Sequence, residues 1–128
     1  MKLVLLIPII LFLPIESKSS DIQPQDNLIA SALEEYAKVA GSWFLNEKCN
    51  YIKGEKKIRF KDNLSLITVT LANDLGSPKL LYPIQVSAKS AAANKKYADC
   101  KGTARDIFNY GYSHSMNWSD QIRILQHK

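Results

Sequence analysis

Residues 26–49, DNLIASALEEYAKVAGSWFLNEKC, carry the pattern from which the fold of this 128-residue chain is inferred. Apolar side chains recur in this stretch at spacings of mostly three and four, which places them on one face of an α-helix. These apolar positions are Ile29, Leu33, Tyr36, Ala37, Ala40 and Phe44. Asp26 is a good N-cap for a helix that begins at Asn27. We expect this helix to run to about Cys49, with Gly41 as a weak point inside it.

The next segment, residues 62–75, has two interpretations. An apolar stripe at helical spacing crosses it and is followed by Gly76, a residue typical of the position just after a helix. The stripe consists of Phe60, Leu64, Ile67, Leu71 and Leu75. The sequence LSLITVTL at 64–71 is also rich in β-branched residues and partly alternates, which suits a strand. We predict a helix, because the stripe covers about four turns and ends in a stop signal.

The C-terminal half also favours helices. Ser77 and Pro78 resemble an N-cap followed by a first-turn proline, and Pro83 marks the start or restart of the main helix. An alanine-rich pattern then continues to Cys100. Gly102 and Thr103 mark a break, and the aromatic tail beyond Tyr110 ends in a short helix that Ser119 could cap. The pattern therefore predicts an all-α domain of four to five helices.

The first nineteen residues are typical of a secretory signal peptide. Met1 and Lys2 form a short positive region, and residues 3–13, LVLLIPIILFL, form an apolar run too short to anchor the chain across a bilayer. Cleavage before Ser20 and cleavage before Lys18 both remain open, as does an uncleaved N-terminal anchor. We predict residues 1–19 as the signal peptide and residues 20–128 as one helical domain, periplasmic or secreted.

The chain has two cysteines, Cys49 and Cys100. In an exported protein such a pair forms a disulfide by default. A reactive thiol and a metal ligand are the alternatives, but neither cysteine has a neighbouring histidine or a Cys-x-x-Cys partner. We expect the disulfide to join two helices.

The charge is mildly basic, with 17 Lys and Arg residues against 12 Asp and Glu. Six of the basic residues lie between Lys48 and Lys61, a stretch that reads as an exposed basic connection. It could contact an anionic membrane surface or an acidic protein, or it could be only a solvated loop. Nucleic acid is a poor candidate, because no binding motif accompanies the charge. Exposed aromatic residues and arginines contribute strongly to binding interfaces, so we add aromatic residues of the C-terminal tail to the basic ones. The predicted contact residues are Lys53, Lys56, Lys57, Arg59, Tyr110, Tyr112 and Trp118.

Motifs for catalysis are absent from the sequence. The histidines are His114 and His127, and there is no phosphate-binding glycine loop, zinc-protease motif or nucleophile elbow. Paired carboxylates such as Glu34 and Glu35 leave a hydrolase as an alternative. An extended segment at 112–118 could offer His114 and a methionine to copper, but we expect it to pack over the core. We predict no enzymatic activity, no cofactor and no metal.

The segment Cys49-Asn50-Tyr51-Ile52-Lys53-Gly54 resembles the Cys-x-Tyr-Ile-x-Gly signature that closes an early helix in type VI secretion immunity proteins of the Tai kind. Architecture alone also resembles the HdeA-like acid-stress chaperones, which share the size, the helical content and the long single-disulfide loop. Both resemblances imply a protein without catalytic centre or cofactor. We therefore expect an exported protein-binding module, either an immunity or inhibitor protein or an accessory subunit of an envelope secretion assembly. A stress chaperone and a basic protein that binds anionic membranes are the alternatives.

Overall fold

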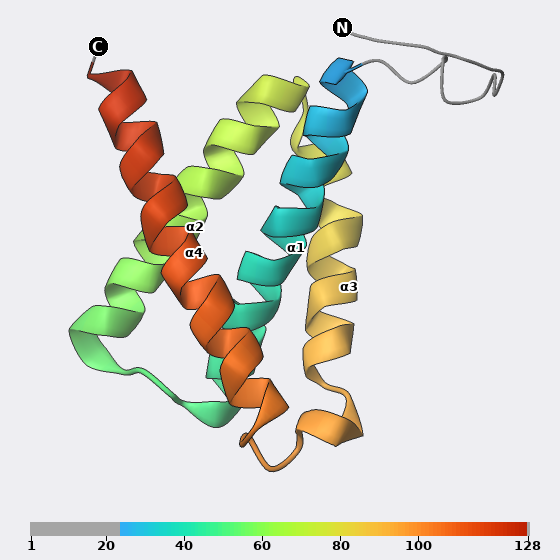
Figure 1. The fold of residues 1–128 in the computed structure, drawn as a ribbon, viewed down its shortest axis with the longest axis vertical. Helices are drawn as coiled ribbons and strands as arrows, with labels where there is room; N and C mark the ends of the chain where they lie inside the picture. The colour runs from blue at the N-terminus through green and yellow to red at the C-terminus, as the bar shows by residue number, and fades with distance from the viewer. Residues whose placement is uncertain (1–23, 128) are drawn as a thin grey trace, which may run out of the picture. The chain divides into compact units, whose positions relative to one another are not determined.

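The computed structural model describes residues 24–127. Within this range the chain forms four α-helices and no strand (Figure 1). The helices are α1 (Pro24–Cys49), α2 (Gly54–Leu75), α3 (Tyr82–Ala92) and α4 (Thr103–Gln126), and two short 3₁₀ turns, η2 (Pro78–Leu80) and η3 (Lys95–Tyr97), flank α3. The prediction of an all-α fold with a Cys49–Cys100 disulfide is confirmed, and residues 62–75 are helical, within α2.

The predicted signal peptide, residues 1–19, lies outside the described residues. Chain contacts divide the protein into two units, Met1–Ala32 and Leu33–Lys128. The described part of the first unit is residues 24–32, the beginning of α1. The second unit contains the hydrophobic core and both cysteines.

Residues 33–49 of α1 belong to the second unit, and there they contact each of the other helices. The Tyr36 hydroxyl donates to Thr68 Oγ1 of α2 (2.9 Å), because the Thr68 hydroxyl proton is already given to a carbonyl within α2. The same tyrosine oxygen accepts a hydrogen bond from Gln85 of α3 (2.9 Å). On another side, buried Ser42 contacts the Ile107 carbonyl oxygen of α4 (2.9 Å). The predicted end of this helix at Cys49 is confirmed.

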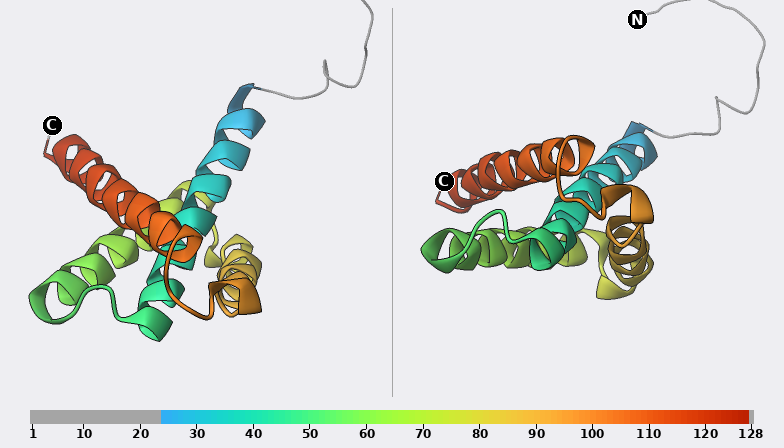
Figure 2. Two further views of the ribbon diagram at one scale, coloured as in Figure 1. Left: turned by 60° about the horizontal axis from the view of Figure 1, so that its bottom comes forward. Right: turned by 90° about the horizontal axis from the view of Figure 1, so that it is seen from below.

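The main core lies between α1, α2 and α4, where Val39, Phe60 and Phe108 pack together. Phe60 makes edge-to-face contacts with three rings, whose centres lie 5.3–6.1 Å from its own ring centre; these are Trp43, Phe108 and Tyr112. Helices α2 and α4 cross each other in this region, and Arg123 of α4 donates to buried Asn63 of α2 (3.0 Å) (Figures 1 and 2).

The end of α3 differs from the sequence prediction. Helix α3 ends at Ala92 rather than near Cys100, because Asn94 caps the separate turn η3 through its side-chain oxygen. Cys100 therefore belongs to the loop before α4, and the disulfide joins the end of α1 to that loop instead of joining two helices.

The predicted break after Gly102 is confirmed, but the tail forms one helix to Gln126 rather than an aromatic segment followed by a short helix. Ser119 is not an N-cap; its hydroxyl donates to a carbonyl one turn earlier within α4 (3.1 Å). The buried face of α4 has a regular helical spacing, although four of its six residues are small or polar. This face consists of Ala104, Phe108, Gly111, Ser115, Ser119 and Ile122.

Candidate binding surface

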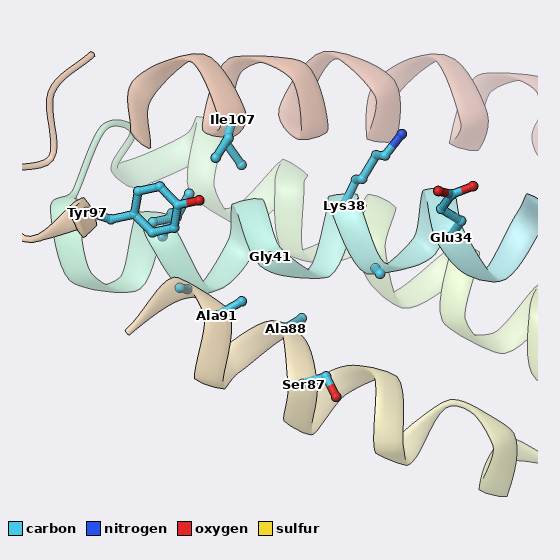
Figure 3. A pocket seen from close by; sticks show the side chains of 11 residues that line it. Glu34, Lys38, Gly41, Ser87, Ala88, Ala91, Tyr97 and Ile107 are labelled. Carbon is cyan, nitrogen blue, oxygen red and sulfur yellow. The ribbon is translucent and has the colours of Figure 1, made fainter. Parts of the chain in front are cut away.

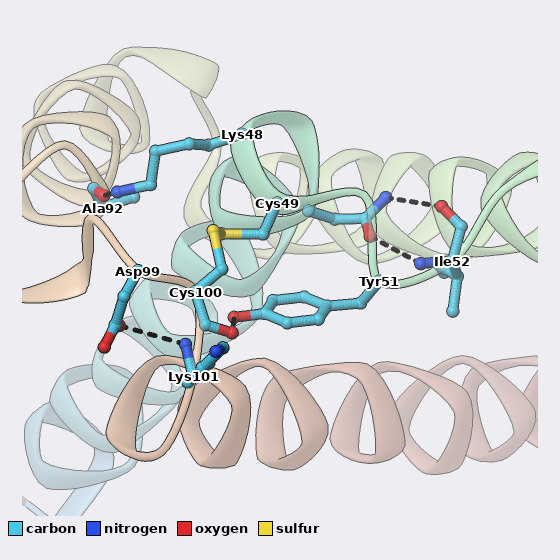
Figure 4. The surroundings of a disulfide bond; sticks show 9 residues. Lys48, Cys49, Tyr51, Ile52, Ala92, Asp99, Cys100 and Lys101 are labelled. Carbon is cyan, nitrogen blue, oxygen red and sulfur yellow. Dashed lines mark hydrogen bonds between the residues drawn. A yellow bond between two sulfur atoms is a disulfide. The ribbon is translucent and has the colours of Figure 1, made fainter.

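The disulfide fixes the junction between α1, α2 and α4 (Figure 4). Its two Cα atoms lie 5.6 Å apart. The Tyr51 hydroxyl donates to the Cys100 carbonyl oxygen (2.6 Å), and Cys100 has a left-handed backbone conformation (φ 61°). Burial raises the pKa of Tyr51 and keeps that hydroxyl protonated. The junction is therefore held by a covalent bond and a hydrogen bond between the same two segments.

The turn between α1 and α2 is fixed by one buried side chain. Asn46 accepts a hydrogen bond from the backbone nitrogen of Ile52 (2.9 Å) and donates to its carbonyl oxygen (3.2 Å); Figure 4 draws both bonds as dashed lines at Ile52. Ile52 lies between two helices, so its backbone groups have no partner within a helix. The Asn46 side chain supplies both partners. The six residues of the Cys49–Gly54 signature thus form a short, tightly bonded turn.

The basic stretch predicted as a connection is mostly helical. Only residues 50–53 connect the helices, and the rest of the stretch after Gly54 lies on the first two turns of α2. Gly54 has a positive φ (58°), a conformation that glycine adopts readily, and it lets α2 begin directly after the turn. The connection is shorter than predicted because α2 begins two turns before its apolar stripe.

The predicted basic contact residues divide into two groups. Lys57 is used within the fold: it pairs with Glu47 (2.8 Å) and lies 5.7 Å from the centre of the Trp43 ring. Lys53, Lys56 and Arg59 are exposed. The neighbouring Lys48 donates to the Ala92 carbonyl oxygen (2.7 Å) and so caps the C-terminus of α3.

The disulfide brings a second basic segment to the first. Residues 47–61 and 95–106, which we call the basic end, carry ten Lys or Arg residues and four Asp or Glu residues. The rest of the chain carries seven Lys or Arg residues and eight Asp or Glu residues. Both segments lie in the lower part of Figure 1 and face the viewer in the right-hand view of Figure 2. The whole positive excess of the protein is therefore gathered at the basic end.

The predicted aromatic contact residues do not lie on one face. Tyr112 packs against the core cluster and stacks on Phe108, with ring centres 5.4 Å apart. Tyr110 and Trp118 flank His114 in a row of three rings along α4, with neighbouring centres 5.7 and 5.5 Å apart. Because the segment is helical, the alternating arrangement considered for a copper site does not form.

Glu35 of α1 contacts two of these three side chains, Tyr110 and His114. The Tyr110 hydroxyl donates to Glu35 Oε1 (2.6 Å) and Lys38 pairs with Oε2 (2.9 Å), and these two contacts lower the pKa of Glu35. His114 Nε2 lies 3.2 Å from Glu35 Oε1, within ion-pair distance but without the geometry of a hydrogen bond. This pairing was not predictable from the sequence, because Glu35 and Tyr110 are 75 positions apart along the chain.

A groove follows α1 between α3 and α4 (Figure 3). Its volume is about 360 Å³. Ala37 and Gly41 of α1 line it together with Ala88 and Ala91 of α3, while Ile107 lines the side of α4. Tyr97 stands at one end and Glu34 at the other. Small residues lie four positions apart on α1 and three positions apart on α3. We did not predict a groove from this spacing.

Within the described residues, no group of three or more His, Cys, Asp or Glu side chains could hold a metal ion. The helices of residues 24–127 include none that is long and apolar enough to cross a membrane. Comparison of the chain with known proteins finds no matching family model, no similar curated protein and no similar solved structure.

Proposed function

We propose that this protein is an exported, non-enzymatic binding module that uses its basic end to bind an acidic protein. The observation that carries the proposal is the concentration of charge, ten basic against four acidic residues, on segments held together by the disulfide. Complementary charge accelerates association and selects partners, and a preformed surface loses less entropy on binding. Export is supported by the predicted signal peptide.

The Cys49–Gly54 signature supports an inhibitor or immunity role in particular. It is the stretch that resembles the Tai-type immunity proteins, and here it forms the turn that positions Lys53 and the first turns of α2. A binding protein of this kind needs a rigid contact surface and no catalytic group. The partner we propose is therefore a secreted or envelope protein with an acidic face.

A matched pair of charge variants tests the proposal. In the basic-end variant, Lys56→Glu is combined with Arg59→Glu. In the control, Lys79→Glu is combined with Lys89→Glu, which gives the same change in net charge outside the basic end. Each purified chain is used to capture proteins from the envelope of cells that make it. We expect wild type and control to retain one acidic protein in stoichiometric amount, and the basic-end variant to bind it at least about tenfold more weakly.

Other outcomes assign the other functions. Equal loss in both variants would mean that only net charge matters, and would contradict a specific surface. Binding to vesicles of anionic phospholipid, lost in high salt, without capture of a protein would favour the membrane alternative. Capture of many unrelated proteins at acidic pH alone would favour a chaperone.

A further inference from the structure

Two glycines lie in the interiors of long helices, Gly111 in α4 and Gly41 in α1. A glycine at such a position destabilises a helix by about 0.5–1 kcal/mol relative to alanine. At Gly111 the structure shows the reason. A Cβ atom there would collide with the Ser42 side chain, so glycine is required for α1 and α4 to approach each other.

Gly41 has no such reason within the described chain. Apart from its chain neighbours and the backbone of its own helix, a Cβ atom at this position would meet no atom within 4 Å, and the backbone of Gly41 is ordinary right-handed helix. The space above it is the groove, and Figure 3 shows Gly41 on the groove floor between the side chains of α3 and α4. Glycine allows another molecule to come close to a helix backbone.

The groove is large enough for such a molecule. Its volume of about 360 Å³ exceeds the cavity of about 150 Å³ that accommodates a benzene ring. Alanine, leucine and isoleucine side chains form most of its lining, so it suits apolar side chains better than a polar ligand.

We propose that the groove above Gly41 receives the apolar side chains of an amphipathic segment of the acidic partner. This inference rests on the proposed function and adds the second part of the contact. Apolar anchors in pockets supply much of the affinity of protein interfaces, whereas surrounding charges supply rate and specificity.

The charges around the groove fix the chemistry and direction of that segment. Tyr97 at one end of the groove belongs to the basic end, and Lys96 Nζ lies 5.1 Å from the centre of its ring, next to Lys95. The other end carries exposed Glu34 and, beside it, Lys38, whose charge is paired with Glu35 (2.9 Å), so the unpaired charge at this end is that of Glu34. Acidic residues of the segment therefore lie toward Tyr97 and away from Glu34. A second copy of this chain fits poorly, because pairing would bring two strongly basic ends near the same interface.

The test uses the oxidised chain from Ser20 and a displayed library of random peptides of about 18 residues, or five helical turns. We expect selected peptides to combine apolar residues at helical spacing with acidic residues at one end. Their affinities are then measured for wild type, for Gly41→Leu, which fills the groove, and for Ser90→Leu. Ser90 is exposed on α3 and does not line the groove, so this variant adds the same side chain elsewhere.

Gly41→Leu is expected to lower the affinity at least about tenfold, while Ser90→Leu leaves it unchanged. The melting temperature of Gly41→Leu should not fall, since leucine is a good helix former and no atom obstructs its Cβ. Absence of any selected peptide, or equal affinity for wild type and Gly41→Leu, overturns the inference. The capture experiment with the Lys56→Glu, Arg59→Glu variant tests the proposed function separately. If that variant loses the acidic protein while the peptides bind wild type and Gly41→Leu equally, the proposed function stands without the groove. If that variant also captures the acidic protein as well as wild type does, both proposals fail.

Discussion

At the scale of single residues, the contact between α1 and α4 depends on the absence of one side chain. The Ser42 hydroxyl lies within hydrogen-bond distance of two carbonyl oxygens, those of Lys38 (3.0 Å) and Ile107 (2.9 Å), and Gly111 leaves it room. We predict that Gly111→Ala destabilises the protein by about 1–3 kcal/mol, because overpacking forces the two helices apart. Urea unfolding followed by circular dichroism measures the difference.

Gly41→Ala is the matched control for this prediction. It places the same methyl group on a helical glycine with open space around it, so it should stabilise the protein by up to about 1 kcal/mol. A Gly111→Ala variant as stable as wild type would show that the close approach of α1 and α4 does not contribute to stability.

Glu35 gives the fold a dependence on pH. The Tyr110 hydroxyl and then Lys38 lower its pKa, so the folded state favours the ionised carboxylate. This stabilisation is complete above the pKa of Glu35 in the unfolded chain, about 4.3, and is lost as the pH falls through the lower folded pKa. We predict that Tyr110→Phe raises the pKa of Glu35, and that the stability lost by this variant at neutral pH disappears in acid.

The carboxyl carbon of Glu35, followed by NMR through a pH titration, reports its pKa directly. Tyr82→Phe removes an exposed hydroxyl from α3 and serves as the control, for which we expect no change. An unchanged Glu35 titration in Tyr110→Phe would contradict the assigned hydrogen bond.

At the scale of elements, α2 begins with charges that oppose its own stability. Its N-cap position is Lys53, which has the extended backbone of a capping residue (φ −141°) but makes no capping bond, and Lys56 and Lys57 lie near the positive end of the helix dipole. We predict that Lys53→Asp stabilises the protein by about 1 kcal/mol, measured by urea unfolding. The same variant should bind the acidic partner more weakly.

Lys61→Asp is the control, because it makes the same change in charge farther along the helix, where no cap forms. It should give little or no gain in stability. Equal gains from both variants would point to net charge rather than to the helix start. Opposite effects of Lys53→Asp on stability and binding would show that the lysine serves recognition.

The sequence was sufficient for the elements whose buried faces are apolar. The stripe through Phe60, Ile67 and Leu71 favoured a helix over a strand at 62–75, and Gly76, which is left-handed (φ 80°), marked its end, although the start of α2 at Gly54 was not predicted. It was insufficient for α4, because hydropathy does not mark buried serines such as Ser115 and Ser119 as core positions. Their hydroxyls bond to carbonyls of their own helix, which makes their burial tolerable.

The candidate surface was predictable in part for a related reason. The basic residues before Lys61 are consecutive enough to be noticed, whereas Lys95, Lys96 and Arg105 join them only through the fold. The groove was not predictable, since its walls come from three helices and its floor is a glycine that resembled a local weakness.

At the scale of the whole molecule, the disulfide joins residues 51 positions apart. Chain-entropy arithmetic for a loop of this length gives about 4 kcal/mol of stabilisation. We predict that replacing both cysteines by serine lowers the free energy of unfolding by about that amount, measured by urea unfolding, and weakens partner binding. A loss below about 1 kcal/mol would show that the turn around Asn46 holds the junction without the covalent bond.

The same bond gives the protein a mechanical property. The disulfide closes a covalent ring that contains α2 and α3, and α1 and α4 leave this ring from neighbouring points. A pulling force applied to the two ends of the chain would pass through the sulfur atoms and would not load the backbone inside the ring. Stretching would therefore pull α1 and α4 away from the rest of the protein. The chain of α2 and α3 would not be extended until the disulfide is reduced.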